Sequence, residues 1–160
     1  MVVTPDFQRE MRPDEVPQVD ALLRLAFGGA AEAELVRALR KAGDMVGEQV
    51  VCAGGAVIGY AGLSRMVAPK GWLCLAPVAV HPDWQGRRVG RRMVGMIAEW
   101  ARLSGVTIVV LGQVGFYERA GFSAARAARL TSPYPVEHTL LAGPGDAVPE
   151  QTLVYPRAFG

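Results

Sequence analysis

The amino-acid sequence predicts an α+β fold, formed as a single domain over residues 1–160. Three observations support this prediction. Apolar residues recur at helical spacing in separate segments, two apolar stretches flank a Gly-Gly turn as in a β-hairpin, and a strand–helix–strand crossover spans Trp72–Leu111. A chain of 160 residues is long enough to bury a core without disulfides or metals.

The expected elements alternate between segments of helical and of strand periodicity, and glycine or proline separates most of them. In chain order they are a strand over Phe7–Met11, a helix over Asp14–Phe27 with Asp14 as its cap, a helix over Ala31–Lys41, strands over Gln49–Ala53, Ala56–Val67 and Trp72–Val80, a helix over Gly86–Ser104, a strand over Val106–Leu111, a helix over Val114–Arg119, and strands over Ala125–Leu130, His138–Leu141 and Thr152–Tyr155.

The strand over Trp72–Val80 is apolar throughout, which is typical of a strand in the middle of a sheet. Pro77 lies inside it, and proline has no N–H for a ladder hydrogen bond. We therefore expect a bulge or a break in pairing at Pro77 that leaves the backbone of Val78, Ala79 and Val80 partly free to bind a ligand. An edge strand with an ordinary proline is the alternative.

Composition narrows the function classes. The net charge of +2 is small for a dedicated nucleic-acid-binding domain. Cys52 and Cys74 lie in apolar stretches, so we interpret both as buried, reduced core thiols. The N-terminal residues do not have the pattern of a signal peptide, and no apolar run is long enough to span a bilayer, so we expect a cytoplasmic protein that does not bind membranes.

The segment that indicates chemistry is the junction between the apolar strand and the helix after it. A helix N-terminus offers free N–H groups and a positive dipole end, which bind phosphate. Gly86 and Gly90 allow the backbone to approach a ligand closely. Cationic side chains are unfavourable at the N-terminus of a helix. The first turns of this helix contain four arginines, so we expect a bound anion to compensate for their charge. They are Arg87, Arg88, Arg91 and Arg92. A solvated basic surface is the alternative.

This junction lacks the Gly-Lys-Ser/Thr ending of a P-loop and the Gly-x-Gly-x-x-Gly pattern of a dinucleotide site. Its residues Gln85-Gly86-Arg87-Arg88-Val89-Gly90 resemble the acetyl-CoA-binding motif Gln/Arg-x-x-Gly-x-Gly/Ala of the GNAT superfamily of N-acetyltransferases. The aromatic pair before Gly-Phe in Phe116–Phe122 resembles the second signature of that family, and the segments around both motifs resemble its YhbS-like branch.

The resemblance implies the GNAT fold, a mixed, mostly antiparallel sheet that is splayed next to the strand 72–80 and flanked by about four helices. It implies that the pyrophosphate of acetyl-CoA lies on the loop amides and that the pantetheine arm pairs with the free strand backbone. The residues concerned are Gln85, Gly86, Arg87, Arg88, Val89, Gly90 and Arg91 for the pyrophosphate, and Val78, Ala79 and Val80 for the pantetheine. No metal is implied.

The family position of the general acid is occupied by Tyr117, whose phenol is protonated at neutral pH and can donate a proton to the departing thiolate. A packing role for Tyr117 is the alternative. The base is open, because the strand contains no carboxylate; a water chain, Glu32, Glu34 and His138 are candidates. His81 is expected to hold the turn after the strand.

One residue departs from the family motif, since Arg88 replaces its first glycine. A non-glycine residue can still offer its N–H if its φ is negative and its side chain points away, so three alternatives are open: Arg88 is neutral, adds a charge-assisted contact to the pyrophosphate, or weakens cofactor binding. A degenerate acyl-CoA-binding module is therefore the alternative to an enzyme. The acceptor is expected to be an amine of a small molecule or protein, and pairing of late strands across a homodimer is an analogy only.

The tryptophans are expected to pack in different places. Trp72 and Trp100 are interpreted as core residues, and Trp84 as support for the phosphate-binding loop.

Overall fold

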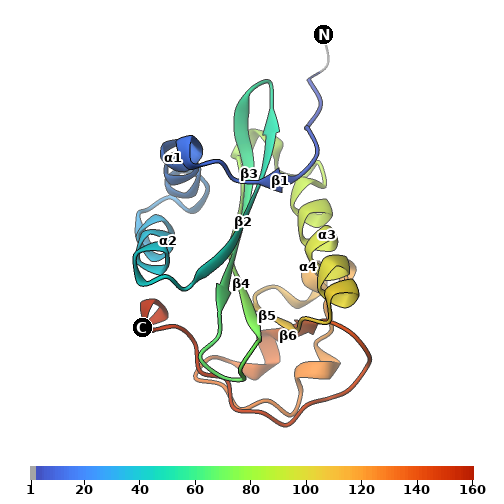
Figure 1. The fold of residues 1–160 in the computed structure, drawn as a ribbon. Coiled ribbons are helices and arrows are strands. Elements are labelled where there is room, and N and C mark those ends of the chain that lie inside the picture. The colour runs from blue at the N-terminus through green and yellow to red at the C-terminus, as the bar shows by residue number, and fades with distance from the viewer. Residues whose placement is uncertain (1–2) are drawn as a thin grey trace.

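The computed structural model describes residues 3–160 as a six-stranded sheet between two pairs of helices (Figure 1). The strands lie in chain order across the sheet, and the pair β4–β5 is parallel whereas the other neighbours are antiparallel. Their bounds are Arg9–Glu10 for β1, Met45–Ala53 for β2, Ala56–Arg65 for β3, Leu73–Val80 for β4, Ile108–Leu111 for β5 and Thr139–Ala142 for β6.

Two helices cover each face of the sheet. Helices α1 (Val16–Phe27) and α2 (Ala31–Ala42) lie on one side in Figure 1, and α3 (Val89–Ser104) and α4 (Val114–Arg119) lie on the other. Separate buried apolar clusters join each pair of helices to the sheet. This mixed sheet with its flanking helices confirms the predicted fold class.

The predicted disruption at Pro77 is a β-bulge. The register between β3 and β4 runs from Ala61↔Val78 to Leu63↔Leu75, so Ala76 and Pro77 together lie opposite Gly62. A Cβ atom on Gly62 would lie 2.9 Å from the carbonyl oxygen of Ala76, which explains why only glycine fits opposite the bulge.

The sheet is also splayed where the prediction places the opening. Parallel pairing between β4 and β5 consists of Leu73↔Ile108 and Cys74↔Val109, after which β4 continues to Val80 without a partner on that side. The backbone of the second half of β4 is therefore available to a ligand on the side of β5.

Several predicted boundaries are wrong for local reasons. Asp14 does not cap α1, because Pro13–Glu15 forms a 3₁₀ turn and α1 begins at Val16. Helix α3 begins at Val89 rather than at Gly86, because the preceding residues form the turn of the functional site.

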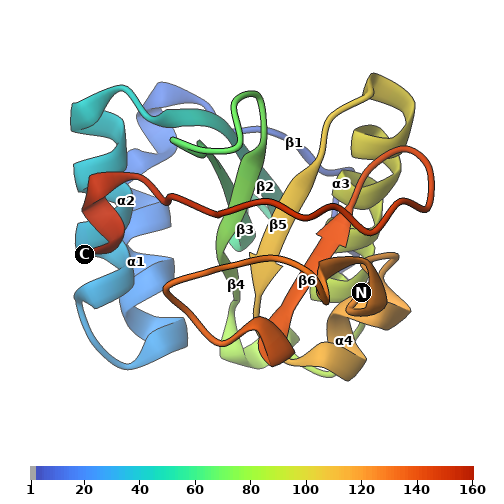
Figure 2. The same ribbon diagram turned by 90° about the horizontal axis from the view of Figure 1, so that it is seen from below.

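The C-terminal third departs most from the prediction. Ala125–Ala127 is a 3₁₀ turn instead of part of a strand, and the Ser123 hydroxyl accepts a hydrogen bond from the Arg126 N–H at 3.2 Å at its start. The predicted strand over Thr152–Tyr155 forms only the isolated bridges Thr131↔Thr152 and Ala68↔Val154. Figure 2 shows this C-terminal segment crossing the molecule and ending beside α2.

The early turns of α3 bury Val89, Met93 and Ile97, and its later turns differ from expectation at Trp100. Val94, Ala98 and Ala101 are buried, whereas Trp100 is 45% and Leu103 is 71% exposed. The prediction of Trp100 as a core residue is wrong, because Ala98 and Ala101 occupy the buried side of this part of α3. Trp72 is half-buried and packs against a core cluster, and both cysteines are buried and free.

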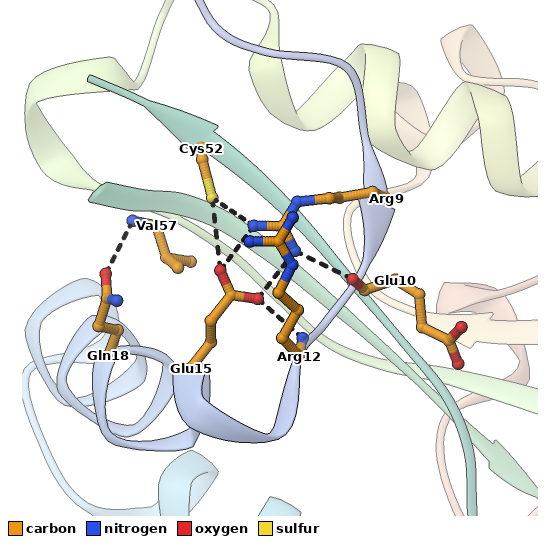
Figure 3. A network of polar contacts seen from close by, with 7 residues as sticks. All are labelled: Arg9, Glu10, Arg12, Glu15, Gln18, Cys52 and Val57. Atoms are coloured by element: carbon orange, nitrogen blue, oxygen red, sulfur yellow. Dashed lines mark hydrogen bonds and ion pairs between the residues drawn. The ribbon is translucent and has the colours of Figure 1, made fainter. Parts of the chain in front are cut away.

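A buried ionic network attaches the N-terminal segment to the sheet (Figure 3). The Glu15 carboxylate accepts two hydrogen bonds from the Arg9 guanidinium, at 2.8 and 2.6 Å, and one from the Arg12 N–H at 2.8 Å. These donors lower the pKa of Glu15 from 4.5 to about 2, with the Arg9 hydrogen bonds as the largest cause. The Cys52 sulfur lies 3.5 Å from the Arg9 guanidinium, which links this network to β2.

Within residues 3–160, no helix has the length and apolar character that crossing a membrane requires.

Candidate active site

A groove of about 480 Å³ lies where β4 separates from β5, between the start of α3 and the aromatic side of α4. It brings together most of the residues that the sequence predicts for the site. Its lining consists of Val78, Val80, Trp84, Gln85, Gly86, Arg88, Val89, Gly90, Arg91, Phe116, Tyr117 and Arg119.

The strand wall of the groove is formed by Val78 and Val80, whereas Ala79, whose backbone is also predicted to bind the ligand, does not line the groove. Side chains alternate across a strand, so Ala79 points to the opposite face, where it is 2% exposed and packs under α1 and α2.

The main chain of β4 alternates in the same way. Ala79 is opposite Tyr60, and the residue pair two positions along is joined by a hydrogen bond from the His81 N–H to the Ile58 carbonyl at 2.8 Å. Hydrogen-bonded pairs recur at every second residue of an antiparallel ladder, so Ala79 bonds β3. The peptide groups of Val78 and Val80 then face the open side of β4, which favours Val78 over Ala79 as an N–H donor to a ligand.

The loop before α3 has two residues in the left-handed region, Gly86 with φ of 76° and Arg88 with φ of 64°. The condition of a negative φ, under which Arg88 could offer its N–H to a phosphate, is therefore not met, because the turn into α3 has the conformation that glycine adopts freely. The first intrahelical bond runs from the Arg92 N–H to the Arg88 carbonyl at 3.0 Å. The N–H groups of Val89, Gly90 and Arg91 precede this ladder and are the donors that a helix start offers to an anion.

Side chains brace this loop against the strand. The Gln85 amide donates to the Val80 carbonyl at 3.1 Å. The Arg87 guanidinium lies 4.9 Å from the centre of the Trp84 ring, and Arg87 does not line the groove, contrary to prediction. Trp84 lines the groove and contacts the core, in agreement with its predicted role as support for the loop.

The turn itself is held by His81, as predicted. Its Nδ1 accepts a hydrogen bond from the Asp83 N–H at 3.1 Å.

The far wall of the groove is aromatic. Tyr117 packs edge-on against Phe116, with ring centres 4.9 Å apart, and against Phe122 at 5.9 Å. Burial, followed by the proximity of Cys74, raises the pKa of the Tyr117 phenol, so it remains protonated at neutral pH and can donate a proton.

The position of Tyr117 depends on the absence of a side chain at Gly112. A Cβ atom on Gly112 would lie 2.5 Å from Cε2 of Tyr117, a distance that the two atoms cannot adopt. The end of β5 thus lies directly against the tyrosine ring.

Besides Trp84, which was predicted only as support for the loop, two lining residues were not predicted as site residues, Phe116 and Arg119. Both belong to α4, and their spacing of three places them on one side of a helix. The sequence could therefore have indicated that Phe116 and Arg119 line the same side of the site. Arg119 brings a cation to the wall opposite the α3 loop.

The candidate bases lie in different places. Glu32 and Glu34 belong to α2, on the opposite side of the sheet from α4 and its Tyr117 (Figure 1). The His138 carbonyl accepts a hydrogen bond from the Gly112 N–H at 2.9 Å, which places His138 at the same corner as Tyr117. None of the three side chains lines the groove.

Across residues 3–160, no group of three or more His, Cys, Asp or Glu side chains is arranged to hold a metal ion.

Comparison with known proteins agrees with this geometry. The acetyltransferase (GNAT) domain family matches residues 46–124. The uncharacterized N-acetyltransferase YhbS of Escherichia coli strain K12 is 35% identical over an alignment of 119 residues, and the alignment covers 71% of this chain and 71% of YhbS.

Two crystal structures of related proteins superimpose closely on the chain. The structure of YhbS from Escherichia coli in complex with CoA has a TM-score of 0.81 and 27% identity, over 96% of this chain and 91% of that one. A GNAT family acetyltransferase from Brucella melitensis in complex with acetyl-CoA has a TM-score of 0.80 and 28% identity, over 96% of this chain and 97% of that one. The chain therefore belongs to the GNAT family of N-acetyltransferases.

Proposed function

We propose that this protein transfers the acetyl group of acetyl-CoA to a primary amine of a small molecule or protein, by direct attack in a ternary complex. The observation that supports this most strongly is the groove itself. It joins the free peptide groups of β4, the N-terminal amides of α3 and the half-buried Tyr117 in one continuous lining.

The chemistry of this lining fits acetyl-CoA. Its phosphates match the amides that precede the α3 ladder and the cations Arg88, Arg91 and Arg119. Its pantetheine arm contains amides that match the outward peptide groups of Val78 and Val80. The complexes of the two relatives with CoA and acetyl-CoA support the same assignment.

Acetyl-CoA supplies a thioester, whose C–S bond breaks as the amine nitrogen forms the new C–N bond. The Val78 N–H is placed to stabilise negative charge on the carbonyl oxygen. The Tyr117 phenol gives its proton to the leaving thiolate and regains one from solvent, while the proton lost by the amine passes to a base or to water. Burial keeps the pKa of Tyr117 above its usual range, so the acid form persists through neutral pH.

The first test is direct binding, by calorimetric titration with acetyl-CoA, CoA and ATP. Micromolar affinity for both CoA species and much weaker affinity for ATP would support the groove as their site. Failure to bind millimolar acetyl-CoA would refute the proposal.

The role of Tyr117 is tested by Tyr117→Phe, which keeps the ring and removes the proton. We expect kcat for thiol release with an amine panel to fall by roughly 10²-fold or more, with little change in the Kd for acetyl-CoA. Tyr134→Phe is the matched control, because Tyr134 donates to the Phe159 carbonyl and does not line the groove.

An unchanged kcat in Tyr117→Phe would show that Tyr117 only packs against the cofactor. A wild-type protein that binds acetyl-CoA but acetylates no amine would instead support the non-catalytic acyl-CoA-binding module.

The proposal includes a single acetyltransferase domain over residues 1–160, a cytoplasmic location and assembly as a homodimer. Cell fractionation tests the location, and light scattering on the purified protein tests the assembly.

A further inference from the structure

Helix α3 has a second apolar stripe in addition to the side that packs on the sheet. The side that faces the core includes Val94 and Ala101, each 0% exposed. Met96, Trp100 and Leu103 recur at spacings of four and three on another side of the helix, and they are 54%, 45% and 71% exposed. Polar residues usually occupy such positions of a surface helix, so this outer stripe is typical of a surface that packs against another protein.

Two hollows open along the same side of α3. One has a volume of about 380 Å³ and is lined by Val46 and Trp100, among others, and the other has a volume of about 370 Å³ and is lined by Phe7 and Arg92, among others. Met96 lines both. The Phe7 side chain is 93% exposed and projects beside the second hollow. The surface around the outer stripe therefore contains both protruding apolar side chains and hollows that can accept them.

Opposite charges flank the outer stripe. Arg92 and Glu99 are seven positions apart, which places them on the same side of α3, about one turn to either side of Met96. Both are exposed, and within residues 3–160 no carboxylate pairs with Arg92. Glu99 pairs with Arg102 on the helix surface, an exposed ion pair of the kind that contributes little to stability.

This pattern is complementary to itself. Helix α3 extends over Val89–Ser104, so its midpoint lies near Met96. When two copies of the helix cross antiparallel at that point, Arg92 of each copy lies opposite Glu99 of the other. The same arrangement brings Trp100 and Leu103 of each copy to the start of the other α3, beside the hollow that Phe7 and Arg92 line. A guanidinium also packs favourably on an indole ring.

We infer that the outer stripe of α3 and the hollows beside it bind a second copy of this chain in a two-fold symmetric dimer. The matching of Arg92 with Glu99 favours this occupant, because a second copy presents the same two charges at the same spacing in the reverse order. The inference rests on the homodimer included in the proposed function and identifies the surface that forms it.

The first test is sedimentation velocity of the full-length protein over a wide range of concentration. Leu103→Glu places a charge in the outer stripe. Leu25→Glu is the matched control, because Leu25 is also an exposed leucine of a helix, at 53%, and belongs to α1 on the other side of the sheet. We expect Leu103→Glu to raise the Kd of the dimer about tenfold or more and Leu25→Glu to leave it unchanged. A wild-type Tm in both variants excludes unfolding as the cause.

Charge reversal tests the pairing across the two-fold axis. Arg92→Glu and Glu99→Arg each place like charges opposite one another, so each should raise the Kd of the dimer by roughly tenfold. The double variant restores opposite charges and should dimerise as the wild type does. Positions 92 and 99 are about 10 Å apart along one helix, so this restoration cannot arise within a single copy.

A wild-type dimer that Leu103→Glu does not weaken would overturn the inference and place the homodimer on another surface. A double variant as weak as the two single variants would overturn the antiparallel arrangement. A wild type that is monomeric at every concentration would overturn both the inference and the proposed assembly, and would leave the outer stripe to a different protein. Acetyl-CoA titration is independent of these results, so failure to bind acetyl-CoA would refute the transferase proposal alone.

Discussion

Individual charged residues of this protein are placed in two contrasting ways. Glu15 is 7% exposed and is fully engaged by Arg9 and the Arg12 N–H. Arg88 is exposed at a groove and has no carboxylate partner in residues 3–160. A buried carboxylate needs partners because its desolvation is otherwise costly, so Glu15 serves the fold, whereas an unpaired cation at a groove is available to a ligand.

The Glu15 network makes stability depend on pH in a defined direction. The pKa of Glu15 is about 2 in the folded protein and 4.5 ordinarily, so the stabilisation is complete above pH 4.5 and is lost as pH falls toward 2. We expect Glu15→Gln to lower Tm at neutral pH and to flatten the fall of Tm in that acidic range, as measured by thermal unfolding.

Asp14→Asn is the control, because Asp14 is the exposed neighbour of Glu15. If Asp14→Asn and Glu15→Gln changed the acid profile equally, the network would not be its source.

At the scale of the elements, the site depends on how the strands end. The bulge at Ala76-Pro77 and the early end of the β4–β5 pairing expose the peptide groups of β4. Gly112, the residue after β5, then allows α4 to place the Tyr117 ring against the backbone. Each of these features interrupts regular pairing, and together they form one wall of the groove.

Gly112→Ala tests this arrangement, because its Cβ would overlap the Tyr117 ring, at 2.5 Å from Cε2. Displacement of a catalytic group by about 1 Å can cost roughly 10²-fold in rate. We expect kcat to fall by tenfold to 10²-fold, with a smaller change in the Kd for acetyl-CoA, in steady-state kinetics and titration.

Combining Gly112→Ala with Tyr117→Phe should add little further loss if both act on the same proton donor. Gly29→Ala is the control, since no atom lies within 4 Å of its added Cβ. Additive losses in the double variant would contradict the positioning role of Gly112.

For the whole molecule, the groove lies between elements that pack against one core cluster. Its walls come from β4, the start of α3 and α4, and a ligand in the groove contacts all of them. Binding to the folded state alone therefore stabilises the complete fold by mass action.

Acetyl-CoA at 100 times its Kd should stabilise the protein by about 2.7 kcal/mol, seen as a concentration-dependent rise in Tm. ATP at the same concentration should have little effect. Equal stabilisation by ATP would indicate general anion binding rather than a CoA site.

Much of the site was predictable because it lies in local patterns. The turn from β4 into α3, the proline in β4 and the aromatic motif of α4 are contiguous segments with their own chemical signatures. It was also predictable that Ala79 does not line the groove, because side chains alternate along a strand and Ala79 therefore lies on the opposite face from Val78 and Val80. The prediction of Trp100 as a core residue was wrong because the packing of α3 against the sheet determines which of its residues are buried.

The sequence by itself determined the α+β class, the helices, the hairpin and the phosphate-binding turn, because hydrophobic periodicity and turn residues act over a few positions. Only the tertiary structure decided the 3₁₀ turn at Ala125–Ala127, the contact of Gly112 with Tyr117 and the positive φ of Arg88. These features depend on contacts between segments distant in the chain or on a backbone conformation, which local residue patterns do not encode.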